Sequence, residues 1–114
     1  MKKLIAVFAL VLFAGVAGAG QEYSSGKHLK LVLERHSTVP MVDLVKNFSE
    51  QCPNVTITTS RERSDYMLQA GGWSGEYRFM IIAKGGDSIY ATKTMLLSNA
   101  VKDVCKFLNA RNPE

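Results

Sequence analysis

The chain has 114 residues and a formal net charge of +4, and it contains two cysteines and one tryptophan. This length corresponds to one domain with a modest hydrophobic core. The basic excess is too small to indicate nucleic acid as the default partner, because nucleic-acid-binding domains concentrate positive charge on one face.

The N-terminal segment has the features of a secretory signal peptide. Two lysines follow the first methionine, an unbroken apolar run covers residues 4–13, and small residues occupy positions 17–19. A membrane anchor is the alternative, but the apolar stretch is shorter than the ~20 residues that a spanning helix requires. We therefore expect cleavage after Ala19. The mature chain, residues 20–114, then has a net charge of +2 and is a soluble periplasmic or extracellular protein without a membrane anchor.

The mature chain begins with a polar segment, residues 20–27, which we expect to be a flexible leader. An alternating apolar pattern follows and predicts a strand. Pro40 then marks the start of a helix, whose apolar positions recur at helical spacing up to Cys52. Pro53 ends this helix, because the residue before a proline is disfavoured in helical conformation.

The same reasoning from periodicity, glycines and prolines covers the whole mature chain. The expected elements are a strand at 29–34, a helix at 41–52, strands at 55–58, 66–70, 76–84 and 88–92, and a helix at 96–109. Gly71 and Gly72 are expected to close the third strand and to begin a flexible loop. Residues 85–87 form a hairpin turn. The centre of the longest strand, 79–83, is apolar on both faces, so we expect both faces to be covered.

This order, β-α-β-β-β-β-α, predicts an α/β fold close to the α+β class. A strand-helix-strand connection is right-handed in nearly all proteins, which makes the first two strands parallel. The last two strands form an antiparallel hairpin. We expect one mixed five-stranded sheet of order 2-1-3-4-5 with both helices on one face. The domain would span residues 28–110, with a C-terminal tail at 111–114.

Cys52 and Cys105 are the two cysteines. An even number of cysteines in an exported chain favours a disulfide. Each cysteine lies on the apolar face of its predicted helix, so neighbouring helices would bring the two within bridging distance. We therefore predict a Cys52–Cys105 bond. The alternative is two separate buried thiols, which behave as small hydrophobic side chains.

The sequence shows no local catalytic or metal-binding motif. His28 and His36 flank the first strand and lie ~26 Å apart if the backbone is extended, so one metal ion cannot bind both. No close set of His, Cys and carboxylate ligands predicts a zinc site, and nothing indicates a cofactor. Either histidine could still act as the base of a small hydrolase, although no Gly-x-Ser-x-Gly motif singles out a nucleophile.

Trp73 is the residue that most suggests recognition, because it lies beside glycines at a connection between strands. An exposed aromatic side chain often anchors a partner. The alternative, that Trp73 folds back as part of the core, is left open. Arg61, Arg63 and Arg78 could form a partner-binding basic patch together with Lys84. Acidic residues are interleaved with them, which favours a solvated surface of mixed charge.

Several segments together resemble small exported bacterial proteins of unknown function. These segments are Cys52-Pro53-Asn54-Val55, Asp65-Tyr66, Gly86-Asp87 and Asn99-Ala100-Val101-Lys102-Asp103-Val104-Cys105. The strand-helix-strand order followed by Asp65-Tyr66-Met67-Leu68 is also distantly similar to the α/β domain of envelope lipoproteins of the curli secretion channel and penicillin-binding-protein activator type. That resemblance implies a binding or assembly module and no catalytic residue. The lipid-anchoring cysteine of those lipoproteins is missing from this chain.

These observations lead to three hypotheses about function. The leading one is a non-enzymatic envelope or secreted module that binds a protein or a cell-wall component. The second is a small hydrolase that uses His28 or His36. The third is a structural subunit that assembles by adding the edge strand at residues 55–57 to another sheet. The sequence does not indicate an oligomeric state.

Overall fold

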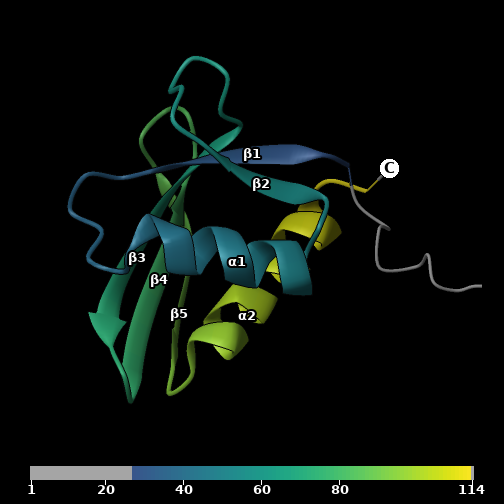
Figure 1. The fold of residues 1–114 in the computed structure, drawn as a ribbon. Coiled ribbons are helices and arrows are strands. Elements are labelled where there is room, and N and C mark those ends of the chain that lie inside the picture. The colour runs from purple at the N-terminus through teal and green to yellow at the C-terminus, as the bar shows by residue number, and fades with distance from the viewer. Residues whose placement is uncertain (1–26, 114) are drawn as a thin grey trace, which may run out of the picture.

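The computed structural model describes residues 27–113, which form five strands and two helices in the predicted order (Figure 1). The elements are β1 (Leu29–Leu33), α1 (Met41–Gln51), β2 (Val55–Thr58), β3 (Tyr66–Trp73), β4 (Glu76–Ile82), β5 (Ser88–Thr94) and α2 (Leu97–Arg111). The predicted signal peptide and most of the predicted leader lie outside the described residues.

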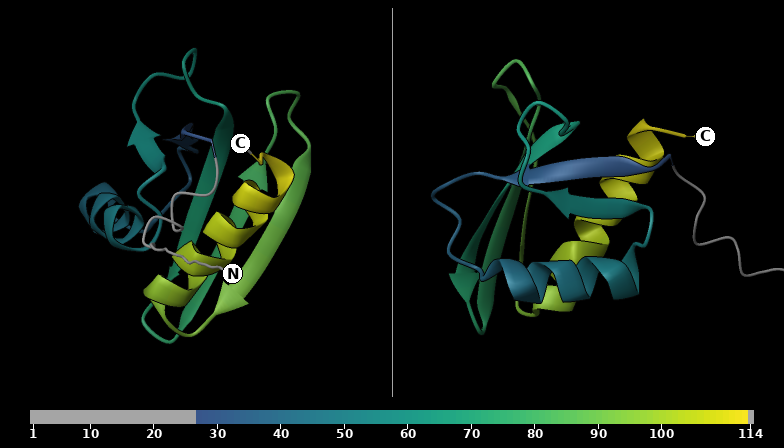
Figure 2. Two further views of the ribbon diagram at one scale, coloured as in Figure 1. Left: turned by 90° about the vertical axis from the view of Figure 1, so that its right-hand side faces the viewer. Right: turned by 45° about the horizontal axis from the view of Figure 1, so that its top comes forward.

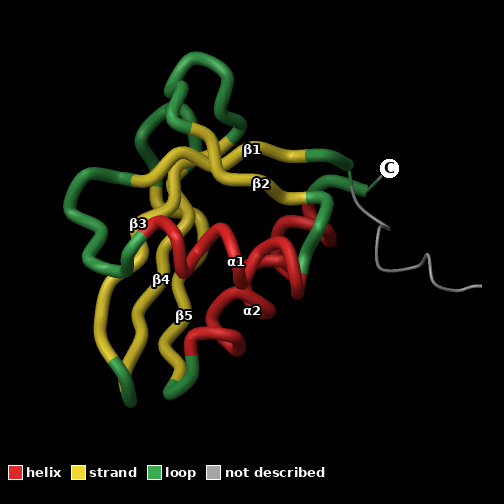
Figure 3. The backbone as a smooth tube through the Cα atoms, viewed as in Figure 1, coloured by secondary structure: helices red, strands yellow, loops and turns green. Residues whose placement is uncertain are grey.

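The strands form one mixed sheet in the order β2-β1-β3-β4-β5, as predicted. Strand β1 is parallel to both β2 and β3, whereas β3, β4 and β5 form an antiparallel meander. Figure 3 shows the long hairpin of β3 and β4 extending below the two helices. The sheet therefore has two edges, the short strand β2 and the longer strand β5.

Both helices lie side by side on one face of the sheet (Figures 1 and 2). Helix α1 begins after Pro40 and buries Leu44 and Phe48 against the sheet. Helix α2 buries Val101, Val104 and other apolar residues against β4 and β5. The hydrophobic core thus lies between the helix pair and one face of the sheet.

The predicted disulfide links Cys52, the residue that caps the C-terminus of α1, to Cys105 in α2. The Cα atoms of Cys52 and Cys105 are 5.9 Å apart and their sulfur atoms are bonded. Beside this bond, the Asn54 side chain is 1% exposed, and its Nδ2 donates to Asn109 Oδ1 at 2.8 Å and to the Lys27 carbonyl at 2.9 Å. The buried amide is therefore hydrogen-bonded, as a polar group in a core requires.

Two expectations for the strands are wrong. Gly71 and Gly72 do not close β3, because the strand continues to Trp73 and pairs residue by residue with β4. The turn is formed by Ser74 and Gly75, and Gly72 accommodates a φ of +106° within the strand. The centre of β4 is not covered on both faces, since both helices lie on the same side. Met80 therefore remains only half-buried.

Candidate binding groove on the open face of the sheet

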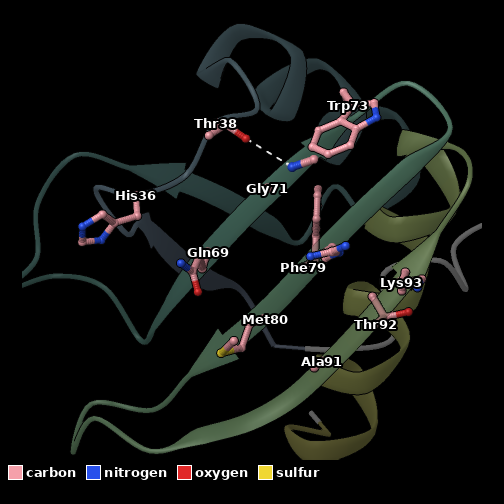
Figure 4. A pocket seen from close by; sticks show the side chains of 12 residues that line it. His36, Thr38, Gln69, Gly71, Trp73, Phe79, Met80, Ala91, Thr92 and Lys93 are labelled. Atoms are coloured by element: carbon pink, nitrogen blue, oxygen red, sulfur yellow. Dashed lines mark hydrogen bonds between the residues drawn. The ribbon is translucent and has the colours of Figure 1, made fainter.

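The face of the sheet opposite the helices carries a groove. Side chains alternate along a strand, so the residues between buried positions such as Leu68, Ala70 and Phe79 point to this open face. The groove has a volume of about 620 Å³ and crosses β3, β4 and β5 (Figure 4). Its lining includes His36, Thr38, Gln69, Gly71, Trp73, Arg78, Met80, Ala91 and Lys93. This volume is within the range of small-ligand sites.

Gly71 creates the hollow in the middle of the groove. It lies on the open face between Gln69 and Trp73 and pairs with Arg78 on β4. A Cβ atom at this position would meet only the Arg78 carbonyl oxygen at 3.7 Å and Thr38 Oγ1 at 3.9 Å, both ordinary contact distances. The missing side chain therefore leaves space that nothing else in the described chain fills closely.

Trp73 forms one wall of the groove, and its side chain is 69% exposed. It is the last residue of β3 and pairs with Glu76, so the strand backbone holds it in place. The structure thus decides between the two interpretations of this residue, because Trp73 is not part of the core. A large aromatic side chain on a rigid element, beside a hollow, has the properties of a binding anchor.

The charged side chains that line the groove are basic. Arg78 and Lys93 line it, and no Asp or Glu is among its lining residues. Arg78 donates from Nε and Nη2 to Glu76 Oε2, and this hydrogen bond, together with the charge of Arg78, lowers the pKa of the Glu76 carboxyl. Lys93 forms no salt bridge within residues 27–113. The groove therefore offers an unpaired ammonium group beside an apolar wall, which favours an anionic ligand.

His36 lies at the opposite end of the groove from Trp73 and Lys93 (Figure 4). Its Nδ1 is 2.7 Å from Glu34 Oε2, and its backbone N–H donates to Glu34 Oε1. The hydrogen bond with His36 is the main cause that lowers the pKa of Glu34. The His36 side chain is 70% exposed, so this pair is formed at the surface.

The hydroxyl groups that follow His36 in the chain are engaged with backbone. Ser37 Oγ donates to the Leu68 carbonyl and accepts from the Ala70 N–H. Thr38 Oγ1 accepts from the Gly72 N–H at 3.2 Å. Within the described part of the chain, no hydrogen bond joins His36 to a hydroxyl, and His28 is exposed without a side-chain hydrogen bond. The histidine–carboxylate pair is thus present without an aligned nucleophile.

The predicted arginines do not meet in one place. Arg78 lies in the groove, whereas Arg61 and Lys84 line a second hollow of about 330 Å³ near Ile82. Arg63 is exposed on the connector between β2 and β3. Among residues 27–113, no three or more potential metal ligands lie together in a cluster. Neither helix in this part of the chain is long and apolar enough to cross a membrane.

Sequence reasoning identified Trp73 and Arg78 but missed the residues around them. Gln69, Met80 and Lys93 come together only because both helices cover the other face of the sheet. The alternation within each strand, combined with the predicted strand order, was the available signal. Comparison with protein-family models, curated proteins and solved structures finds no match to this chain.

Proposed function

We propose that this chain is an exported, non-enzymatic binding module that holds an anionic ligand with an apolar part in the groove on its open sheet face. The exposed Trp73 side chain beside the unpaired Lys93 ammonium is the observation that carries this proposal. The physiological partner would be a protein or cell-wall component that presents a carboxylate or phosphate next to an apolar group. Acidic peptides and glycan-linked peptides both have this chemistry.

Export is part of the proposal. The signal-peptide features of residues 1–19 support it, and the Cys52–Cys105 bond is consistent with an oxidising compartment. The resemblance to exported bacterial proteins and to the envelope-lipoprotein domain points in the same direction. Mass spectrometry of protein recovered from the native host should give a chain that begins at Gly20 and contains no free thiol. A chain that retains residue 1 would contradict export with cleavage.

A pair of matched dyes tests the groove. The dye 8-anilinonaphthalene-1-sulfonate carries an apolar ring system and one negative charge, and N-phenyl-1-naphthylamine has the same rings without the charge. Trp73 is the sole tryptophan, so its fluorescence reports binding at the groove. We expect the sulfonate to quench Trp73 and to bind more tightly than the neutral dye, because only the sulfonate pairs with Lys93.

Substitutions of Lys93 and Trp73 test whether the dyes bind in the groove. Lys93→Gln should weaken the sulfonate about fivefold, as expected for an ion pair at an exposed site, and should leave the neutral dye unchanged. Trp73→Ala should weaken both dyes, measured by dye fluorescence. Lys102→Gln is the matched control, since Lys102 is an exposed lysine on α2, on the other side of the sheet. Equal binding of the two dyes, or equal effects of both lysine substitutions, would contradict the proposal.

The hydrolase is the second candidate, and the Glu34–His36 pair at the end of the groove favours it. A carboxylate that orients an imidazole is one part of a catalytic triad. Hydrolysis of p-nitrophenyl acetate by the wild type, His36→Ala and His28→Ala separates the two functions. A binding module predicts equal rates for all three, whereas turnover lost only in His36→Ala would establish the hydrolase.

A further inference from the structure

A second hollow continues the groove along β3 and β4. On the open face, Gln69 and Met80 are directly opposed, and Met67 and Ile82 form the next pair along the same two strands. The first pair lines the groove, and the second pair lines the hollow of about 330 Å³. Figure 4 shows Gln69 and Met80 at the end of the groove away from Trp73. Because successive pairs on one face are only ~7 Å apart, the two hollows adjoin, and we call them together the channel.

Both ends of the channel carry basic side chains. Arg78 and Lys93 are directly opposed at one end, and Arg61 and Lys84 line the other. Neither lining includes an Asp or a Glu. Within residues 27–113, Arg61, Lys84 and Lys93 form no salt bridge. Lys84 follows Arg78 by six residues in the chain, so the two basic ends are about 20 Å apart where the backbone is extended.

The middle of the channel is largely apolar but contains one amide. Met67, Met80 and Ile82 are half-buried there. Between them and Trp73 lies the Gln69 side chain, which is also half-buried and has no side-chain hydrogen bond with residues 27–113. Its amide can therefore both donate to and accept from a ligand.

An extended peptide matches these spacings. Side chains on one face of an extended chain repeat every second residue, at the same ~7 Å as the paired residues in the channel. The first and seventh side chains of such a peptide lie on one face, about 20 Å apart. They would reach both basic ends, whereas a compact anion would reach only one. A free peptide group beside Gln69 would use the amide.

We propose that the channel binds an extended acidic segment of a partner protein, in which acidic residues at positions i and i+6 flank apolar side chains. One carboxylate pairs with Lys93 and the other with Lys84, while the apolar side chains cover Met80 and Met67. This inference rests on the proposed function, because it specifies the ligand of the same groove.

Two capped peptides of identical composition and charge test the spacing. The peptide Glu-Ser-Leu-Ser-Leu-Ser-Glu carries its acids at positions 1 and 7, and its isomer Glu-Ser-Glu-Ser-Leu-Ser-Leu carries them at positions 1 and 3. Their affinities are measured by NMR titration of the mature, oxidised, isotope-labelled protein. The isomer reaches only one basic end, so we expect it to bind about fivefold more weakly than the 1,7 peptide.

Substitutions at the second hollow separate this inference from the proposed function. Lys84→Gln should weaken the 1,7 peptide about fivefold and leave 8-anilinonaphthalene-1-sulfonate unchanged, because the compact dye stays beside Trp73. Gln69→Leu removes the amide at similar size and should weaken the same peptide about threefold. Lys102→Gln, on α2 across the sheet, is the control and should change neither ligand.

Equal affinities of the two peptides, or a 1,7 peptide unaffected by Lys84→Gln, would overturn the channel. If the dye still binds beside Trp73 and responds to Lys93→Gln, the proposed function survives that result. If neither the dye nor the peptides bind, the proposed function fails and this inference fails with it.

Discussion

Reduction of the Cys52–Cys105 bond should remove a large part of the stability of this domain. The bond closes a loop with a sequence separation of 53 residues. In the chain-entropy model, such a loop restricts the unfolded chain by about 14 cal/mol/K, or roughly 4 kcal/mol at 25 °C. The total stability of a small domain is only about 5–15 kcal/mol. Because 1 kcal/mol shifts the Tm of a domain of this size by ~4–8 °C, the Tm should fall by roughly 15–30 °C.

Thermal unfolding followed by circular dichroism, with and without a phosphine reductant, measures this change. Reduction leaves both sulfur atoms in place, so it creates no cavity beside the fully buried Cys52. The double variant Cys52→Ala/Cys105→Ala is the control, and its Tm should not respond to the reductant. If reduction lowers the free energy of unfolding of the wild type by less than about 1 kcal/mol, the bond does not stabilise the fold by restricting the conformations of the unfolded chain.

Three further predictions concern the β3–β4 hairpin. Gly72→Ala should cost more than ~2 kcal/mol in urea unfolding, because the added Cβ would lie 2.2 Å from the Glu76 carbonyl oxygen. Gly75→Ala has a similar φ of +98° but open space around it, so about 1 kcal/mol is expected, and equal costs would contradict the steric argument. Trp73→Ala should change stability by less than ~0.5 kcal/mol, since the side chain is mostly exposed; a larger loss would mean that it is part of the core. Arg78 lowers the pKa of Glu76 below its ordinary 4.5, so this contribution to stability is present above pH 4.5 and is lost as the pH falls through the folded-state pKa. Between about pH 6 and pH 3, the free energy of urea unfolding should therefore fall less for Glu76→Gln than for the wild type. The same fall in both proteins would contradict a stabilising role of the Glu76 carboxylate.

The fold was predictable because local patterns and chain topology agree. Helix α1 lies between Pro40 and Pro53, and the crossover rule predicted the parallel pairing of β1 and β2. The ends of the strands were harder to predict. Glycines usually interrupt a strand, yet pairing with β4 carries β3 through Gly71 and Gly72 to Trp73. Tertiary pairing thus overrides a local preference at this point.

The groove was predictable only in part, for a different reason. Trp73 and Arg78 stand out by residue type, but Gln69 and Lys93 do so only when the uncovered face is known. The apolar centre of β4 suggested a sheet covered on both sides. In the structure, Met80 lies instead in the lining of the groove. Apolar residues on a strand therefore could not distinguish a second buried face from a binding surface.

The strand order also divides the molecule into two consecutive halves. Residues 29–58 hold β1, α1 and β2, and residues 66–111 hold the meander and α2. Their sheets are joined along a seam of only three residue pairs, from Leu31 opposite Tyr66 to Leu33 opposite Leu68. The second half has mostly local pairings, which form early in folding. The disulfide crosses this seam from one half to the other, so the two halves of the oxidised protein stay covalently joined even when one of them unfolds.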